Sequence, residues 1–314
     1  MESNNYTTIV FCGGSCKCIS FCGAIQYLNE HDMMQDINHV VGVSAGSLIG
    51  LFYILGYSPT DIITEINKLN TEYIFGQELN LWTIPSAVYN LISSLGISDG
   101  KQLKEHMRIL LSKKKIPFSV TFEELFERTG VKFTVSATNL HYKSLESFNY
   151  IDTPHVSVIK ALQASMCLPF IFQPVNIGGD LYIDGGMQDN LPVSLTENGE
   201  KVLAIKLETD ENFGSSDYSF IPYISDILDI ALSNVWPETH HYSDHVDFVT
   251  IHIPYMSILN FNLTNEEIQT LSNAGYDSMC RKFYYHNNNI NNLSNKLSNN
   301  VIKSKHHRYR KESK

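Results

Sequence analysis

Short apolar runs alternate along this chain with longer segments of helical periodicity. Runs rich in β-branched and aromatic residues predict buried strands at residues 7–11, 39–43, 181–183, 202–207 and 246–253, and a hairpin at 131–138 and 144–150. Apolar residues at helical spacing predict helices at residues 19–29, 45–55, 60–69, 99–111, 156–165, 221–235 and 265–285. Because strands and helices alternate, we expect an α/β fold with a central, mainly parallel sheet flanked by helices.

Polar residues before several apolar segments mark expected helix starts. Thr60 is predicted to cap one helix, and Ser98 or Asp99 another. Thr121 with Glu124 three residues later has the spacing of a capping box. Residues 75–97 are apolar but irregular, and we interpret them either as a core helix or as a lid over an apolar site.

Residues 40–60 carry no charge and are long enough to span a bilayer. They also contain Gly42-Val43-Ser44-Ala45-Gly46, which lies between a predicted strand and a predicted helix. This G-x-S-x-G pattern at such a junction is typical of a nucleophile elbow, where a sharp turn exposes one hydroxyl. A buried strand, a tight turn and a buried helix therefore explain the uncharged stretch without a membrane span, and Ser44 is the candidate nucleophile.

A serine nucleophile needs backbone donors aimed at the developing oxyanion. Gly13 and Gly14 follow the first predicted strand and precede a helix, so their amides are candidates. The alternative is a phosphate-binding loop for a nucleotide. Neither G-x-G-x-x-G nor G-x-x-x-x-G-K-[ST] is present there, which disfavours that alternative.

Two kinds of residue are candidates for the base that activates Ser44. Asp184 follows a short apolar strand and precedes two glycines, although Asp-Gly alone also favours a simple turn. Histidines later in the chain would give the order Ser, Asp, His of the α/β-hydrolases. These histidines are His240, His241, His245 and His252.

As an ordered set, these motifs resemble the patatin-like phospholipases. That family has a glycine-rich oxyanion loop after its first strand, then a G-x-S-x-G elbow and a later Asp-Gly-Gly or Asp-Gly-Ala motif. Residues 161–169, which read ALQASMCLP, resemble the family's segment ahead of the aspartate, and Asn190-Leu191-Pro192-Val193 resembles the one after it. The resemblance covers roughly residues 6 to 207.

The resemblance implies a three-layer patatin-like fold and a catalytic dyad of Ser44 and Asp184, without a histidine, a metal or any other cofactor. It also implies an oxyanion site formed by the loop Gly13, Gly14, Ser15, Cys16 and Lys17, joined by the amide of Ala45. The chain departs from the family pattern at two positions of this loop. Ser15 replaces the third of three glycines, and Cys18 replaces the glycine that follows the basic residue.

Charge is unevenly distributed along the chain. The net charge is −10, yet residues 286–314 hold seven Lys or Arg residues and one Glu, which leaves −16 on residues 1–285. An acidic body argues against nucleic acid as the partner. We expect a catalytic domain over 1–285 and a disordered tail over 286–314, Asn-rich and then basic, that either contacts anionic lipid or only aids solubility.

The first residues lack the charged and apolar regions of a secretory signal, and we expect a cytoplasmic protein, in peripheral contact with a membrane. The six cysteines are therefore expected to be free thiols. Four of them, at positions 12, 16, 18 and 22, match no common zinc spacing and are interpreted as small buried residues.

These observations favour a serine lipid acyl hydrolase of the phospholipase A or lysophospholipase type, acting on a phospholipid or another acyl lipid. Two alternatives remain at this stage. One is an α/β-hydrolase esterase with a Ser–Asp–His triad. The other is a catalytically weak lipid-binding protein, which the altered glycine loop would allow.

Overall fold

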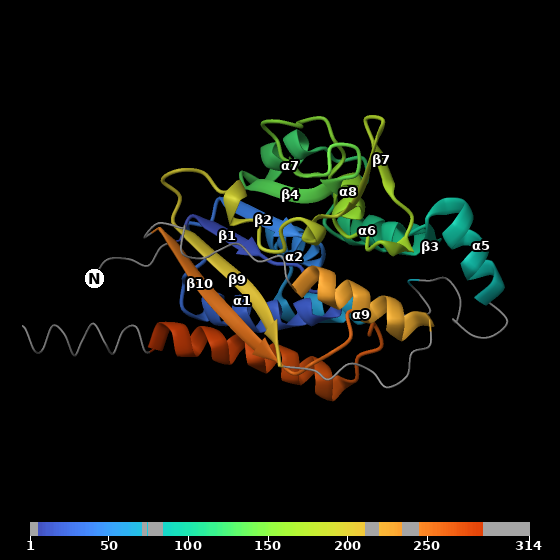
Figure 1. Ribbon diagram of the computed structural model, residues 1–314. Helices are drawn as coiled ribbons and strands as arrows, with labels where there is room; N and C mark the ends of the chain where they lie inside the picture. Colours follow the sequence, from blue (N-terminus) through green and yellow to red (C-terminus); the bar gives the residue numbers. More distant parts are fainter. Residues whose placement is uncertain (1–5, 71–73, 75–83, 211–219, 234–244, 285–314) are drawn as a thin grey trace, which may run out of the picture.

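A computed structural model describes residues 6–70, 74, 84–210, 220–233 and 245–284 (Figure 1). Its main sheet has the strand order β10-β9-β1-β2-β4-β8-β7, with β5 also paired to β4. The pairings from β10 to β4 are parallel, and those of β4 with β5 and β8 and of β8 with β7 are antiparallel. These strands are β1 (Thr8–Phe11), β2 (His39–Val43), β4 (Lys132–Asn139), β5 (Ser144–Phe148), β7 (Val175–Ile177), β8 (Asp180–Asp184), β9 (Val202–Thr209) and β10 (Val246–Ile253).

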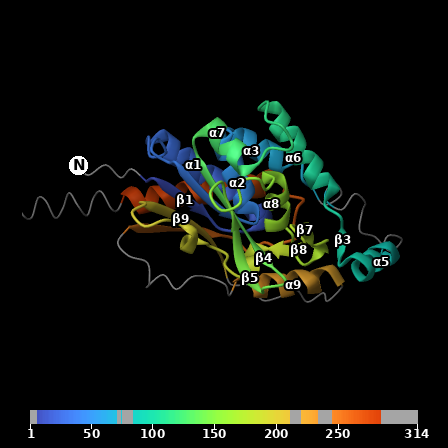
Figure 2. The same cartoon turned by 90° about the horizontal axis from the view of Figure 1, so that it is seen from above.

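Helices flank this sheet, and two short strands form a second sheet. The helices are α1 (Ser20–Glu30), α2 (Ala45–Ile54), α3 (Pro59–Ile66), α5 (Ile84–Ser94), α6 (Lys101–Lys113), α7 (Phe122–Thr129), α8 (Val158–Ser165), α9 (Phe220–Ser233) and residues 265–284. The second sheet pairs β3 (Gly96–Ser98) with β6 (Phe170–Phe172). Seen from above, α1, α2, α3, α6 and α8 lie toward one side of the main sheet and α9 toward the other (Figure 2). The arrangement is a three-layer α/β fold.

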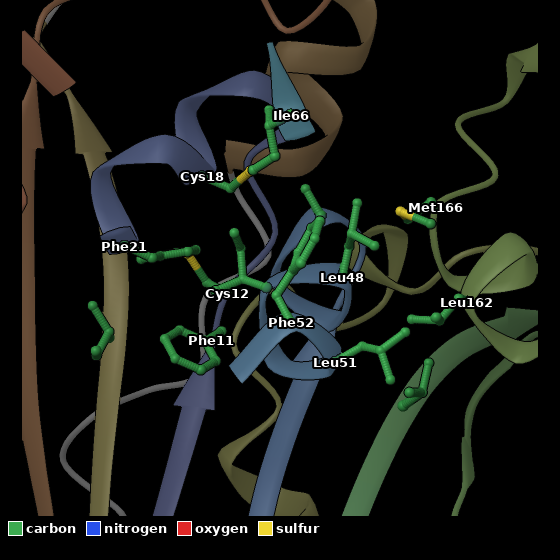
Figure 3. Close-up of a cluster of buried hydrophobic side chains, with 14 of the residues drawn as sticks. Phe11, Cys12, Cys18, Phe21, Leu48, Leu51, Phe52, Ile66, Leu162 and Met166 are labelled. Atoms are coloured by element: carbon green, nitrogen blue, oxygen red, sulfur yellow. The ribbon is translucent and has the colours of Figure 1, made fainter. Parts of the chain in front are cut away.

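The core lies between the sheet and α2. This helix is apolar on all sides, because β1 and β2 cover one of its faces and α8 another. Phe11 from β1, Phe21 from α1 and Phe52 from α2 are among its fully buried side chains. Figure 3 shows them with Cys12 and other neighbours in one continuous cluster. This packing fixes the strand-to-helix junction at residue 44 from both sides.

Two glycines bring α1 and residues 265–284 into close contact. A Cβ added to Gly23 would lie 1.8 Å from the carbonyl oxygen of Ser272, and one added to Gly275 would lie 1.8 Å from that of Ser20. Any side chain at either position would therefore push the helices apart. The contact fastens the C-terminal helix to the body of the fold.

Three sequence-based expectations about local structure were wrong. Ser58, not Thr60, caps α3, in a capping box with Asp61, and Pro59 occupies the first turn. Gly100, in a left-handed conformation, occupies the N-cap position of α6, although the Asp99 carboxylate accepts a 3.1 Å hydrogen bond from the Lys101 amide at the start of the helix. The core-helix alternative for residues 75–97 fails for α5, whose residues Tyr89 and Ile92 are mostly exposed.

Other local expectations were confirmed. Thr121 and Glu124 form the capping box of α7, and β4 and β5 form the hairpin. All six cysteines are free thiols, and the four in the N-terminal group are buried. Within the described ranges, no helix is both long enough and apolar enough to cross a bilayer.

Candidate active site

Ser44 occupies a strained turn between β2 and α2. Its backbone has φ 51° and ψ −133°, a region that residues with a side chain rarely adopt. Two glycines make the turn possible. A Cβ at Gly42 would lie 2.5 Å from the Cα of Ser47, and one at Gly46 would lie 2.3 Å from the carbonyl oxygen of Cys12. The G-x-S-x-G pattern thus reflects two close backbone approaches around a single strained serine.

The structure brings Ser44 and Asp184 together from opposite parts of the chain. The Ser44 hydroxyl donates a 2.6 Å hydrogen bond to Oδ2 of Asp184, and the amide of Gly186 donates a 2.8 Å bond to Oδ1. Asp184 ends β8, opposite Ala137 of β4, and is fully buried. A carboxylate so placed can accept the Ser44 proton without a third group between them.

Burial changes the acidity of this carboxyl group. Removal from water raises the pKa of Asp184 to about 7, and the hydrogen bonds from Ser44 and Gly186 oppose that rise by favouring the charged form. A base with a pKa near the working pH combines a useful deprotonated fraction with a strong pull on the proton. Burial therefore adapts Asp184 to general-base chemistry near neutral pH.

Two further polar residues bond to the backbone of Ser44 and Asp184, and a third lies against the glycine loop. The Ser165 hydroxyl accepts a 2.8 Å hydrogen bond from the Ser44 amide, and the Thr138 hydroxyl donates one of 2.8 Å to the Asp184 carbonyl. Asn190 lies against the glycine loop, and its Oδ1 would be 2.4 Å from a Cβ on Gly13. Sequence reasoning assigned none of these roles, although Ser165 and Asn190 fall in the two motifs flanking the aspartate.

The glycine loop offers fewer free amides than its sequence suggested. The Gly13 amide donates to the Asn190 carbonyl at 3.2 Å, and the Lys17 amide donates to the Gly14 carbonyl at 3.0 Å. Within the described residues, the Gly14 and Ser15 amides donate no such bond, and neither does the Ala45 amide at the start of α2. The amides of Gly14, Ser15 and Ala45 are therefore candidates for donating to an oxyanion, whereas those of Gly13 and Lys17 are occupied.

Side chains of this loop lie in contrasting surroundings. Ser15 has φ 52°, and its buried hydroxyl has no hydrogen-bond partner among the described residues. The Lys17 ammonium lies 3.5 Å from a carboxylate oxygen of Asp229 on α9, an ion pair that is mostly buried. Cys16 contacts the sulfur of Met256 at 3.8 Å. The lysine charge is thus directed toward α9.

The cysteines around this loop are unreactive by environment. Burial raises the pKa of the Cys12, Cys16 and Cys22 thiols to about 12 and raises that of Cys18 well above its usual range. The Cys12 thiol also accepts a hydrogen bond from the Leu207 amide at 3.2 Å. The group serves packing, as its sequence spacing indicated.

The histidines considered for a triad are not at the site in the described part of the chain. The side chains of Ser44 and Asp184 hydrogen-bond to each other and to the Gly186 amide. His252 is exposed on β10, with its ring 3.7 Å from Glu208. His245 precedes β10, and its carbonyl accepts a 2.9 Å hydrogen bond from the amide of Val202, where β9 begins, at the sheet edge opposite Ser44. His240 and His241 lie outside the described residues.

Two cavities of different character meet at Ser44. One, of about 80 Å³, is apolar and is lined by Leu48, Ile74, Met166, Phe172 and other hydrophobic side chains. The other, of about 280 Å³, is polar on one side and is lined by Gly14, Lys17, Asp184, Asn190, Asp229 and Tyr255 among others. A molecule with an apolar chain and a polar group on either side of an ester would fit across them.

No cluster of three or more His, Cys, Asp or Glu side chains suited to a metal ion occurs in the ranges that the structure describes. The polar groups around Ser44 are backbone amides, which donate, and the Asp184 carboxylate, which accepts, and they match acyl transfer through a serine.

Comparison with known proteins matches residues 9–196 to a family model described as Patatin-like phospholipase. One relative, "Probable lipid hydrolase 463L" of Invertebrate iridescent virus 6, is 29% identical over 221 residues, which cover 69% of this chain and 70% of that protein. "Uncharacterized protein R571" of Acanthamoeba polyphaga mimivirus is 27% identical over 199 residues, which cover 63% of this chain and 64% of that protein.

A fungal protein and a bacterial structure extend the comparison. "Lysophospholipase NTE1" of Cryptococcus neoformans is 24% identical over 67% of this chain, which spans 12% of that protein. Among solved structures, VipD from Legionella pneumophila superposes with a TM-score of 0.55 at 19% identity, covering 88% of this chain and 66% of that one. This likeness supports the three-layer α/β arrangement.

Proposed function

The chain belongs to the patatin-like phospholipase family, and from that premise we propose that it is a serine acyl hydrolase of lipid esters, of the phospholipase A or lysophospholipase type. The observation that carries the proposal is the 2.6 Å hydrogen bond from Ser44 to a buried Asp184, at the junction of an apolar and a polar cavity. A lipid hydrolase and a lysophospholipase among the relatives are consistent with it.

In the proposed reaction, Asp184 accepts the hydroxyl proton as the Ser44 oxygen attacks the ester carbonyl. The amides of Gly14, Ser15 and Ala45 donate to the resulting oxyanion. When the tetrahedral intermediate collapses, Asp184 returns the proton to the departing alcohol, and the acyl group remains on Ser44. Water, activated by the same carboxylate, then releases the fatty acid and restores the serine.

We assign the two products to the two cavities. The acyl chain lies in the apolar cavity beside Leu48 and Met166, and the alcohol with its polar group lies in the cavity that contains Lys17. Phospholipid and lysophospholipid are the proposed substrates. Action at a membrane surface from the cytoplasm, and a catalytic domain ending near residue 285, are also part of this proposal.

Release of labelled fatty acid from mixed phospholipid vesicles, in EDTA, tests this function. The wild type should release fatty acid, and Ser44→Ala should not. Ser278→Ala is the matched control, because Ser278 is also buried but lies on the C-terminal helix. Equal release by the wild type and Ser44→Ala would refute the proposal, and dependence on added calcium would refute its metal-free mechanism.

A histidine scan separates the dyad from a triad. Single alanine substitutions at His240, His241, His245 and His252 should leave activity within about tenfold of the wild type, less than loss of a general base causes. A near-complete loss at any of them, with the fold intact by circular dichroism, would favour the α/β-hydrolase alternative.

A further inference from the structure

Two bulky apolar residues are held in a left-handed backbone conformation at the protein surface. Leu95 has φ 63° with 57% of its surface exposed, and Phe170 has φ 69° with 44% exposed. This conformation is unfavourable for a residue with a large side chain, and exposure of the side chain to water adds a second cost. Strain of this kind is retained where the surrounding structure imposes it, often for function.

These two residues are neighbours in space. Leu95 precedes β3, and Gly96 of β3 pairs with Phe170 of β6. A Cβ on Gly96 would lie 2.3 Å from the backbone of Phe172, so the two strands approach too closely for any side chain there. The small β3–β6 sheet therefore fixes Leu95 and Phe170 side by side.

A cavity of about 350 Å³ lies beneath them, lined by Leu91, Leu95, Leu140, Phe170, Phe172 and Ile183 together with two prolines. Phe172 also lines the apolar cavity at Ser44. One buried aromatic ring thus separates an apolar surface groove from the cavity beside the nucleophile. The groove and the proposed acyl site are therefore neighbours, with the Phe172 ring between them.

The exposed apolar area extends from this groove onto α5. Tyr89 and Ile92, three residues apart on the helix, are 70% and 76% exposed. Figures 1 and 2 both place α5 at one extremity of the molecule, beyond β3. Leu140 directly follows β4, which runs parallel to β2, so it lies at the same sheet edge as Ser44.

We propose that Tyr89, Ile92, Leu95, Leu140 and Phe170 form a docking surface that inserts into the acyl region of a lipid bilayer. This inference rests on the proposed function, since the groove leads to the cavity assigned to the acyl chain. A lipid chain entering at Leu95 and Phe170 passes Phe172 to reach Ser44 without crossing water. The bilayer also removes the exposed apolar side chains from water.

Flotation with phosphatidylcholine vesicles tests the docking surface. Neutral lipid and high salt both suppress electrostatic attraction of the basic residues in 286–314, because salt screens charges but does not weaken apolar burial. All proteins carry Ser44→Ala, so binding is measured without hydrolysis. Ile92→Asp should weaken binding about tenfold or more, because a charge replaces an inserted apolar side chain.

Ile151→Asp is the matched control. Ile151 is also exposed, but it follows β5, which runs antiparallel to β4, and it lies at the opposite sheet edge from Leu140. Its substitution should leave vesicle binding unchanged. Equal binding by both variants, or no binding by the parent, would overturn the proposal.

Two further readouts complete the experiment. With Ser44 restored, Ile92→Asp should keep full activity on a soluble short-chain ester while losing activity on vesicles. Inactivity of the wild type on every ester would refute the proposed function and leave the vesicle-binding result standing. A change in oligomeric state by sedimentation on Ile92→Asp substitution, without a change in vesicle binding, would show a contact between copies instead.

Discussion

Two serines beside the same cavity have nearly the same positive backbone φ, 51° at Ser44 and 52° at Ser15. Their partners differ. The Ser44 hydroxyl donates to a buried carboxylate and its amide donates to Ser165, whereas the Ser15 hydroxyl is buried without a partner among the described residues. Both loops contain a serine with positive φ, but only the elbow has a carboxylate base beside the hydroxyl. A nucleophile is therefore recognised by the group that receives its proton.

The largest expected difference is in rate. Ser44→Ala and Asp184→Asn should each lower kcat on a lipid ester by about 10³-fold or more, and the double substitution should be little worse, because the two groups act as one unit. Ser15→Ala keeps the backbone amide and should stay within about tenfold. Additive losses of kcat at Ser44 and Asp184 would show that the two groups do not act as one unit. A loss of kcat in Ser15→Ala as large as theirs would remove the distinction between the two loops.

The pH dependence tests the environment of the base. Because the proposed mechanism uses Asp184 as the carboxylate, and burial raises its pKa to about 7, kcat/KM should rise as pH increases through about 7. The expected change is measured by initial rates on a soluble ester from pH 5 to 9. A profile that is flat over this range would contradict the assigned role.

The same pKa makes a prediction about stability. A carboxyl group with a raised folded-state pKa holds its proton longer in the native protein, so it destabilises the fold as pH rises from about 4 through 7. Asp184→Asn removes a buried charge and should raise the free energy of unfolding at pH 8 by a few kcal/mol, at about 1.4 kcal/mol for each pKa unit. The gain should vanish near pH 4 in urea titrations.

Backbone strain at the elbow should appear as a smaller stability difference. Ser44→Gly relieves the φ 51°, ψ −133° conformation, whereas Ser44→Ala retains it. The glycine variant should be more stable than the alanine variant by about 1 kcal/mol, the lower end of the cost of such a conformation. Both variants lack the Ser44 hydroxyl, so their thermal unfolding differs only through the backbone conformation at this position. A more stable alanine variant would show that the elbow is unstrained.

The smallest expected effect separates two costs at Ser15. Ser15→Ala removes the unpartnered hydroxyl, and Ser15→Gly also relieves the φ 52° conformation. Both should raise the free energy of unfolding, with glycine ahead by about 0.5 to 1 kcal/mol. If the alanine and glycine variants have the same free energy of unfolding, backbone strain at Ser15 is negligible. Ser15 and Ser44 would then share a similar φ without sharing a conformational cost.

The sequence predicted the elements nearest the elbow well. The strand at 39–43 matches β2 residue for residue, and the expected family fold was confirmed. These elements combine β-branched residues, a glycine-flanked turn and an apolar helix, so local propensity and packing agree there. The pairing of Ser44 with Asp184 was expected from the family resemblance, and the residues alone had left the histidines open.

Other features depend on contacts that no local pattern records. The antiparallel pairing of β4 with β8 joins two strands that lie far apart in the chain. The Gly13 amide is occupied because Asn190 folds back onto the loop. The Ser58 cap was missed because the adjacent Thr60 has similar capping preference, and only the backbone angles separate the two.

The buried thiols around the glycine loop give the folded protein a chemical signature. Only a thiolate reacts readily with an alkylating reagent, and burial keeps Cys12, Cys16, Cys18 and Cys22 protonated at neutral pH. Cys280, on the C-terminal helix, is partly exposed and should be labelled first. Modification of the four thiols around the glycine loop requires the core to open, so their labelling rate, followed by mass spectrometry, measures how often this region unfolds.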